Sequence, residues 1–155
     1  MPKIDIGSIP LDTGTNYPDP FHRVVAGRER KRLGNAVGLD QFGVNLTRLK
    51  PGAASALRHW HEREDELVYM LEGEAVLIEN DGETVLKPGD AAGFKANNGN
   101  GHHLVNRSNR DAVYLEIGTR SKHEYVEYPD VDMLHIRDDK GMRYTHKDGR
   151  EYPKR

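Results

Sequence analysis

Short β-like runs separated by turn residues constrain the fold of this chain more than any other feature. From about residue 36 onward, apolar and β-branched side chains gather in short runs. Clusters rich in Gly, Asn, Pro and Lys separate these runs, as at 80–82, 87–89 and 97–101. No stretch keeps the 3.6-residue periodicity of an amphipathic helix. The pattern predicts an all-β protein, an antiparallel barrel or sandwich of short strands.

The sequence also predicts where the strands lie and what flanks them. Residues 1–34 contain several prolines, so we expect an irregular N-terminal arm, in which the basic run 28–32 is a solvated segment. Residues 35–120 form the expected β-domain, and residues 121–155 form a C-terminal extension. The predicted strands cover residues 36–39, 42–49, 55–61, 65–72, 74–79, 84–86, 90–94, 102–106, 112–119, 124–128 and 133–137.

The composition excludes several classes of protein. A chain of 155 residues suffices for one domain with a buried core. Lys and Arg number 23 against 25 Asp and Glu, so the formal net charge of −2 argues against nucleic acid or membrane partners. The absence of cysteine excludes disulfides and thiol ligands. Because the polar N-terminal segment also lacks a signal peptide or membrane span, we expect a cytoplasmic protein.

Candidate metal ligands gather in residues 51–73, PGAASALRHWHEREDELVYMLEG. His59 and His61 are two residues apart, so on an extended strand both imidazoles point to the same face. Glu66 begins the next β-like run and can bring a carboxylate to the same ion from the neighbouring antiparallel strand. Imidazole nitrogens with one carboxylate suit a divalent transition metal: manganese, iron, nickel, cobalt or zinc.

The spacing of these residues resembles the first motif of the cupin superfamily. In that motif Gly52 is followed by His59, His61, Glu66 and Gly73, with a first interval of six residues where five is usual. The resemblance implies an antiparallel jelly-roll-like β-barrel that covers about residues 37–118 and occurs once in the chain.

A second cupin motif opens at Gly89 and closes with His102 and Asn106. It departs from the family pattern, since Lys95 stands where proline is usual and the loop that follows is about two residues longer. The resemblance makes His102 the fourth predicted metal ligand. Strand alternation puts His102 and Asn106 on one face and His103 on the other, and the spacing to Asn106 favours His102.

The segments GHHLVNRS, YLEIGTR, YPDVD and YTHKDG resemble a group of small bacterial single-domain cupins, some of which carry the label sugar-phosphate isomerase. The resemblance implies a metal-dependent enzyme of isomerase type that acts on a small polar metabolite, such as a sugar or sugar phosphate. Two alternatives stay open: an iron-dependent dioxygenase of a small organic substrate, and a non-catalytic module that binds a small molecule.

An isomerase also needs a proton-transfer group and a cation for the substrate phosphate. The candidates for proton transfer are Glu116, Tyr114 and Tyr69, and those for the phosphate are Arg48, Lys50 and Lys95, although each has a simpler structural interpretation. The histidines outside both motifs are read as surface residues: His22, His123, His135 and His146.

We expect a homodimer, because the arm and the extension offer material to clasp a twofold mate. No pair of helices precedes the β-domain, which argues against a helix-turn-helix and DNA binding. The expected partners are therefore a small-molecule ligand or substrate and a second copy of the chain.

Overall fold

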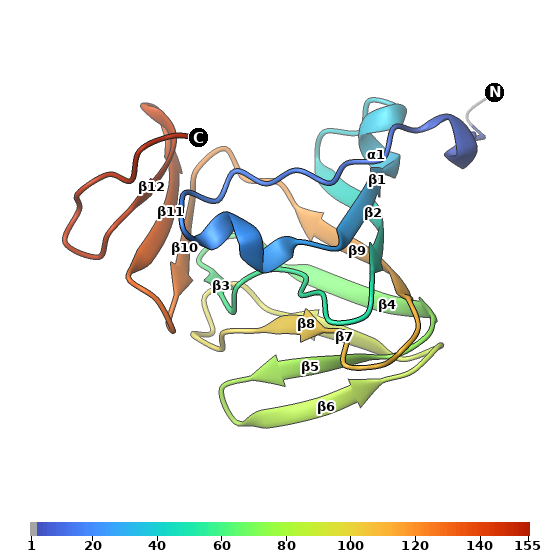
Figure 1. Ribbon diagram of the computed structural model, residues 1–155. Helices are drawn as coiled ribbons and strands as arrows, with labels where there is room; N and C mark the ends of the chain where they lie inside the picture. Colours follow the sequence, from blue (N-terminus) through green and yellow to red (C-terminus); the bar gives the residue numbers. More distant parts are fainter. Residues whose placement is uncertain (1–2) are drawn as a thin grey trace.

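The computed structural model describes residues 3–155, and most of their regular structure is β-strand (Figure 1). The first two residues of the predicted arm, Met1 and Pro2, lie outside this range. The strands are β1 (Arg28–Arg32), β2 (Phe42–Leu49), β3 (Trp60–His61), β4 (Glu66–Glu72), β5 (Ala75–Glu79), β6 (Gly82–Leu86), β7 (Ala91–Phe94), β8 (His103–Val105), β9 (Ala112–Thr119), β10 (Glu124–Tyr128), β11 (Met133–Asp138) and β12 (Gly141–Thr145).

The helical segments are short and lie near the N-terminus. Two are 3-10 helices, at Ile6–Ser8 and Phe21–Val25, and α1 (Leu33–Ala36) is one turn of α-helix. Within the described part of the chain, no helix has the length and apolar character to cross a membrane.

The strands of the described residues form three antiparallel sheets. The largest has the order β1-β2-β9-β4-β7, the second β12-β11-β10-β3, and the third β6-β5-β8. Figure 1 shows β10, β11 and β12 of the second sheet, in orange and red, at the opposite side of the molecule from the arrowhead of β4. The prediction of an all-β, antiparallel jelly roll is confirmed, although hydrogen bonds do not close the sheets into a barrel.

The main core lies between the largest sheet and the third one. Alternation along the strands turns Leu49, Met70 and Tyr114 inward, and each is fully buried. Leu77 and Leu104 complete the cluster from the facing sheet. Burial of these apolar side chains is the main favourable contribution to folding.

The N-terminal arm packs against the C-terminal sheet of its own chain. Tyr17 makes edge-to-face contacts with Tyr128 and Tyr144, with ring centroids 5.7 Å and 5.8 Å apart. Val25 and Met133 are buried in the same cluster. The arm and the extension therefore form a second, smaller core, and Tyr17, Tyr128 and Tyr144 also line a cavity of the protein.

Three local predictions are wrong. Residues 36–39 are not a strand but the end of α1 and a turn, in which Gly38 has a φ of +73°. The basic run Arg28–Arg32 is not a solvated segment but edge strand β1; all five residues are charged, so the strand lacks the apolar alternation that would predict it. Most of residues 55–61 is irregular, and only Trp60–His61 forms a strand. Strand Gly141–Thr145 was not predicted from its polar sequence.

Candidate metal centre

Four separate elements bring the predicted ligands together. His59 and His102 are joined by a β-bridge, with N···O distances of 3.2 Å and 2.9 Å. His61 belongs to β3, which pairs with β10, and Glu66 begins β4. The ligand side chains therefore meet where the three sheets approach one another.

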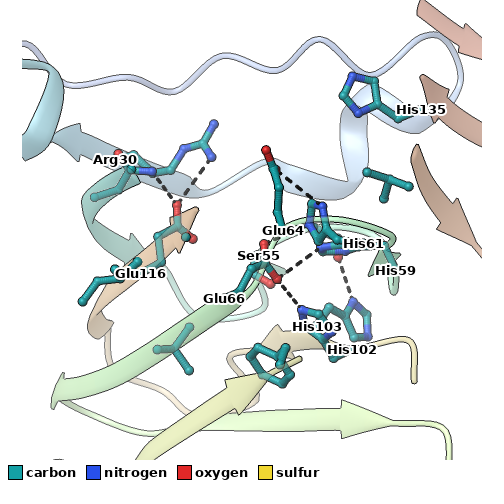
Figure 2. Close-up of a pocket in the computed structure, with 18 of the residues that line it drawn as sticks. Arg30, Ser55, His59, His61, Glu64, Glu66, His102, His103, Glu116 and His135 are labelled. Atoms are coloured by element: carbon teal, nitrogen blue, oxygen red, sulfur yellow. Dashed lines mark hydrogen bonds and ion pairs between the residues drawn. The ribbon is translucent and has the colours of Figure 1, made fainter. Parts of the chain in front are cut away.

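Three imidazoles turn their Nε2 atoms to the Glu66 carboxylate (Figure 2). Nε2 of His102 lies 2.6 Å from Oε2 of Glu66, and Nε2 of His61 lies 2.9 Å from Oε1. His59 is farther away, at 3.9 Å from Oε2. Ligand atoms of His59, His61 and Glu66 lie close enough together to hold one divalent transition metal, and His102 adjoins this group through Oε2 of Glu66. That these residues bind such an ion stays a prediction.

The rings are oriented by contacts away from Glu66. Nδ1 of His59 is 2.7 Å from the carbonyl oxygen of Leu57, a contact in which Nδ1 donates. Its Nε2 then carries the lone pair that a metal requires. The ring of His102 stacks on Phe94, with centroids 3.6 Å apart and an interplanar angle of 2°. Both rings thus turn Nε2 to the centre.

His61 is held from behind by a second acidic pair. Its Nδ1 lies 3.4 Å from Oε2 of Glu124 and 3.8 Å from Oε1 of Glu64. The Glu124 side chain is 1% exposed, and its other oxygen accepts hydrogen bonds from the backbone N–H groups of Arg63 and Tyr125. A buried carboxylate behind a ligating imidazole is a common way to orient the ring and raise its basicity.

The metal-free centre holds buried charges of opposite sign. Burial lowers the pKa of His61, but the neighbouring carboxylates of Glu124 and Glu66 outweigh it and raise the pKa to about 10. Burial raises the pKa of Glu66, but hydrogen bonds from His102, His59 and His61 hold it well below its usual range. Coordination by His61 therefore requires the loss of a proton.

The structure distinguishes His102 from its neighbour His103. His102 faces Glu66, whereas Nδ1 of His103 contacts the carbonyl oxygen of Ala56 at 2.7 Å. Asn106, which closes the second motif, is fully buried and has a structural role. Its amide group donates hydrogen bonds to the carbonyl oxygens of Leu49 and Arg110.

A cavity of about 860 Å³ opens from the four-residue centre toward the inner face of the largest sheet. Glu116 and Tyr114, two of the predicted proton-transfer candidates, line it. Tyr69 does not; it lies on the outer face of β4 and is 41% exposed. A volume of this size accommodates a small metabolite beside the centre.

The predicted phosphate partners lie outside the cavity. Arg48 pairs with Asp111 at 3.1 Å, Lys50 with Glu29 at 2.9 Å and Lys95 with Asp65 at 3.4 Å. None of the three lines the cavity, which favours their simpler structural interpretation.

Sequence reasoning missed several residues that line the cavity. His135, expected at the surface, faces the cavity from β11 and stacks on Tyr144, with centroids 4.9 Å apart. Arg30 lines it from β1. The signal that could have found Arg30 is the i, i+2 spacing of arginines within Arg28–Arg32, which puts them on one face of a strand. The remaining histidines outside the motifs pair with aspartates: His22 with Asp19, His123 with Asp139 and His146 with Asp132.

Comparison with known proteins agrees with this architecture. Residues 45–118 match the family model described as Cupin domain. A solved structure from Silicibacter pomeroyi, described as a sugar phosphate isomerase from a cupin superfamily, is 45% identical over 97% of this chain and 96% of its own, with a TM-score of 0.93. A candidate sugar phosphate isomerase from Acidithiobacillus ferrooxidans is 28% identical over 88% of this chain and 86% of its own, with a TM-score of 0.78.

More distant similarity shows the fold alone. The polyketide cyclase RemF from Streptomyces resistomycificus is 19% identical over 77% of this chain and 79% of its own, with a TM-score of 0.64. No match was found among curated proteins. The 45% identity to the Silicibacter pomeroyi protein spans nearly the whole of both chains, so it identifies the family and not merely the architecture. The chain belongs to the cupin superfamily.

Proposed function

We propose that this cupin is a metal-dependent enzyme of isomerase type that acts on a small polar metabolite, a sugar or sugar phosphate. The observation that carries the proposal is the convergence of three imidazoles and one carboxylate at a cavity of about 860 Å³. The two relatives described as sugar phosphate isomerases, one of them only as a candidate, support the choice of substrate class.

In this proposal His59, His61, Glu66 and His102 hold the ion. A divalent ion with open positions polarises a carbonyl group and stabilises the negative charge that develops when a neighbouring proton is removed. The cavity excludes bulk water from the bound substrate and orients it beside the centre.

Glu116 is the proposed proton carrier between the two substrate carbons. Its Oε1 accepts a hydrogen bond from Nδ2 of Asn45 at 2.8 Å, which fixes the carboxylate at the cavity wall. Tyr114 does not suit the role of a base, because complete burial raises the pKa of its hydroxyl well above the usual value. It therefore stays protonated and serves as a hydrogen-bond donor, not as a base.

The decisive assay uses protein purified without chelator or affinity metal. The metal content per chain is measured, and a panel of aldose and ketose phosphates is followed by NMR in deuterated water. Isomerisation with solvent deuterium at the carbon next to the carbonyl is expected. We expect Glu116→Gln to lower kcat about 100-fold or more with unchanged metal content.

Two results would contradict the proposal. Full metal content with no turnover of any sugar phosphate would contradict the isomerase, and iron as the bound metal would then direct the search to a dioxygenase. A folded protein that takes up no metal on reconstitution would favour a non-catalytic binding module.

A further inference from the structure

Three polar side chains form a cross-strand row in which Arg30 and Tyr114 line the cavity and Thr47, between them, is fully buried. Arg30 of β1 pairs with Thr47 of β2, and Thr47 pairs with Tyr114 of β9. Residues opposite one another on neighbouring strands point to the same face of the sheet. The face in question is the inner one, since Arg30 and Tyr114 both line the cavity.

Each member of the row has a buried donor atom without a partner. The atoms are Nε of Arg30, Oγ1 of Thr47 and the hydroxyl oxygen of Tyr114, and none makes a hydrogen bond within residues 3–155. A buried donor left unpaired costs about 1–3 kcal/mol. Three such atoms in one cross-strand row are uncommon in a folded protein, and a ligand rich in acceptor atoms would satisfy them.

The charge around the row is incompletely balanced. Arg32 is neutralised by Asp12, to which it donates two hydrogen bonds, at 2.9 Å and 2.6 Å. Arg28 is 7% exposed and donates only to backbone carbonyl oxygens. Arg30 lies between them and has two loose carboxylate contacts, Oε1 of Glu116 at 3.6 Å and Oδ2 of Asp12, which Arg32 already holds, at 3.9 Å. A buried guanidinium is stable when paired with an anion, so this part of the wall favours one more negative charge.

The row and the candidate metal centre lie apart from one another. Figure 2 shows the Arg30 side chain above Glu116, on the same side of the cavity and apart from the four-residue centre. Tyr114, the row member nearest β4, pairs with Met70, which is four residues along β4 from Glu66, a separation of about 13 Å. A ligand that reaches both places must therefore carry its anionic group several bonds away from its metal-binding group.

We propose that Arg30, Thr47 and Tyr114 form an oxyanion site for the distal phosphate or carboxylate of the substrate. The proposal rests on the proposed function for its substrate, but the site itself does not depend on the metal. It names the substrate class more closely: a chain of several carbons with a carbonyl or hydroxyl end at the metal and an oxyanion end at Arg30.

The test titrates chelator-treated protein with inorganic phosphate and, separately, with acetate, by isothermal titration calorimetry. We expect saturable binding of one of the two anions to the wild type. Arg30→Gln should weaken it about tenfold or more, because a charge-assisted hydrogen bond is lost. Arg48→Gln is the matched control: it removes the same charge from the opposite face of β2 and should bind as the wild type does.

Tyr114→Phe supplies an independent readout. Without an added anion its melting temperature should equal or exceed that of the wild type, because the deleted hydroxyl has no partner. Its affinity for the anion should still fall about tenfold. Preference for phosphate over acetate assigns a phosphate ester, and the reverse assigns a carboxylate.

The outcomes separate the site from the enzyme. Unchanged anion affinity in both Arg30→Gln and Tyr114→Phe, or no saturable binding to the wild type, would overturn the oxyanion site even if the protein isomerises sugar phosphates. Arg30-dependent anion binding in a protein that turns over no sugar phosphate would leave the site standing and remove the isomerase.

Discussion

At the scale of single residues, acceptor groups behind two of the imidazoles orient them toward the candidate centre. The carbonyl oxygen of Leu57 holds Nδ1 of His59, and the carboxylate of Glu124 faces Nδ1 of His61. Backbone and carboxylate acceptors in this position orient a ring and set which nitrogen carries the proton.

Glu124→Gln is predicted to weaken metal affinity about tenfold or more while the protein stays folded, because the amide is a poorer partner for the His61 ring. Competition with a chromogenic chelator measures the effect. Glu127→Gln is the control, since Glu127 lies on the same strand but on its opposite face. Equal losses in both variants would show that strand β10, and not the carboxylate, is responsible.

His102→Ala is predicted to lower metal content more than His103→Ala. Only His102 faces Glu66, whereas His103 contacts the carbonyl oxygen of Ala56. Elemental analysis of the two purified variants measures the metal content per chain. The reverse order would assign the ligand to His103 and shift the register of the second motif by one residue.

The sequence could predict the four candidate ligands because two motifs keep them at regular spacing on short strands. It could not predict Arg30, Glu124 or His135 as neighbours of the centre. Their approach depends on how the N-terminal arm and the C-terminal sheet pack around the cavity, and those contacts join segments far apart in the chain. Residues 36–39 show a related limit, because their apolar composition suits a strand as well as the turn that they form.

At the scale of elements, the turn between β4 and β5 requires a glycine for steric reasons. Gly73 links β4 to β5 with a φ of +67°, and a Cβ at this position would lie 2.2 Å from the carbonyl oxygen of Asp111. Gly73→Ala is predicted to lower the free energy of unfolding by about 3 kcal/mol or more, from both the clash and the backbone strain.

Gly38→Ala is the matched control for this turn. Gly38 has a similar φ of +73°, but a Cβ at this position would have no atom of another residue within 4 Å. We expect a loss of about 1 kcal/mol from strain alone. Urea denaturation measures both values, and equal losses would refute the steric part of the explanation.

His135 of β11 makes the stability of the folded protein depend on pH. Burial first, and then the charge of Arg137, lower its pKa from the ordinary 6.5 to about 4. The unfolded chain therefore binds a proton below pH 6.5 that the folded protein binds only below about pH 4, and stability falls as the pH drops between these values. The expected loss between pH 7.5 and pH 5 is about 2 kcal/mol.

Comparison with His135→Gln isolates this contribution, because glutamine does not titrate in the range. The difference in unfolding free energy between the wild type and the variant should change by about 2 kcal/mol from pH 7.5 to pH 5. A difference that is constant with pH would show that His135 titrates normally in the folded protein.

At the scale of the whole molecule, the homodimer stays a prediction. The N-terminal arm packs against the C-terminal sheet of its own chain, so these two segments contact each other and do not extend toward a second copy. An apolar row remains on the outer face of β4, where Leu67, Tyr69 and Leu71 are 42%, 41% and 39% exposed. We propose that a second copy covers this row.

Tyr69→Lys is predicted to convert the dimer into a monomer, because it introduces a charge into the middle of the apolar row. Light scattering coupled to size-exclusion chromatography measures the mass. Val85→Lys, at an exposed apolar position on β6, is the control and should leave the dimer intact. A wild type that is monomeric at all accessible concentrations would refute the homodimer.

Three separate sheets meet at the candidate centre, and this arrangement affects how cooperatively the protein unfolds. His61 belongs to the sheet of β10, Glu66 to the sheet of β2 and β9, and His102 adjoins β8 in the third. No hydrogen-bonded ladder joins these sheets within the described residues. An ion shared by the three side chains would cross-link them and make them unfold as one unit. In a chain without a single cysteine, it would hold distant segments together as a disulfide does elsewhere.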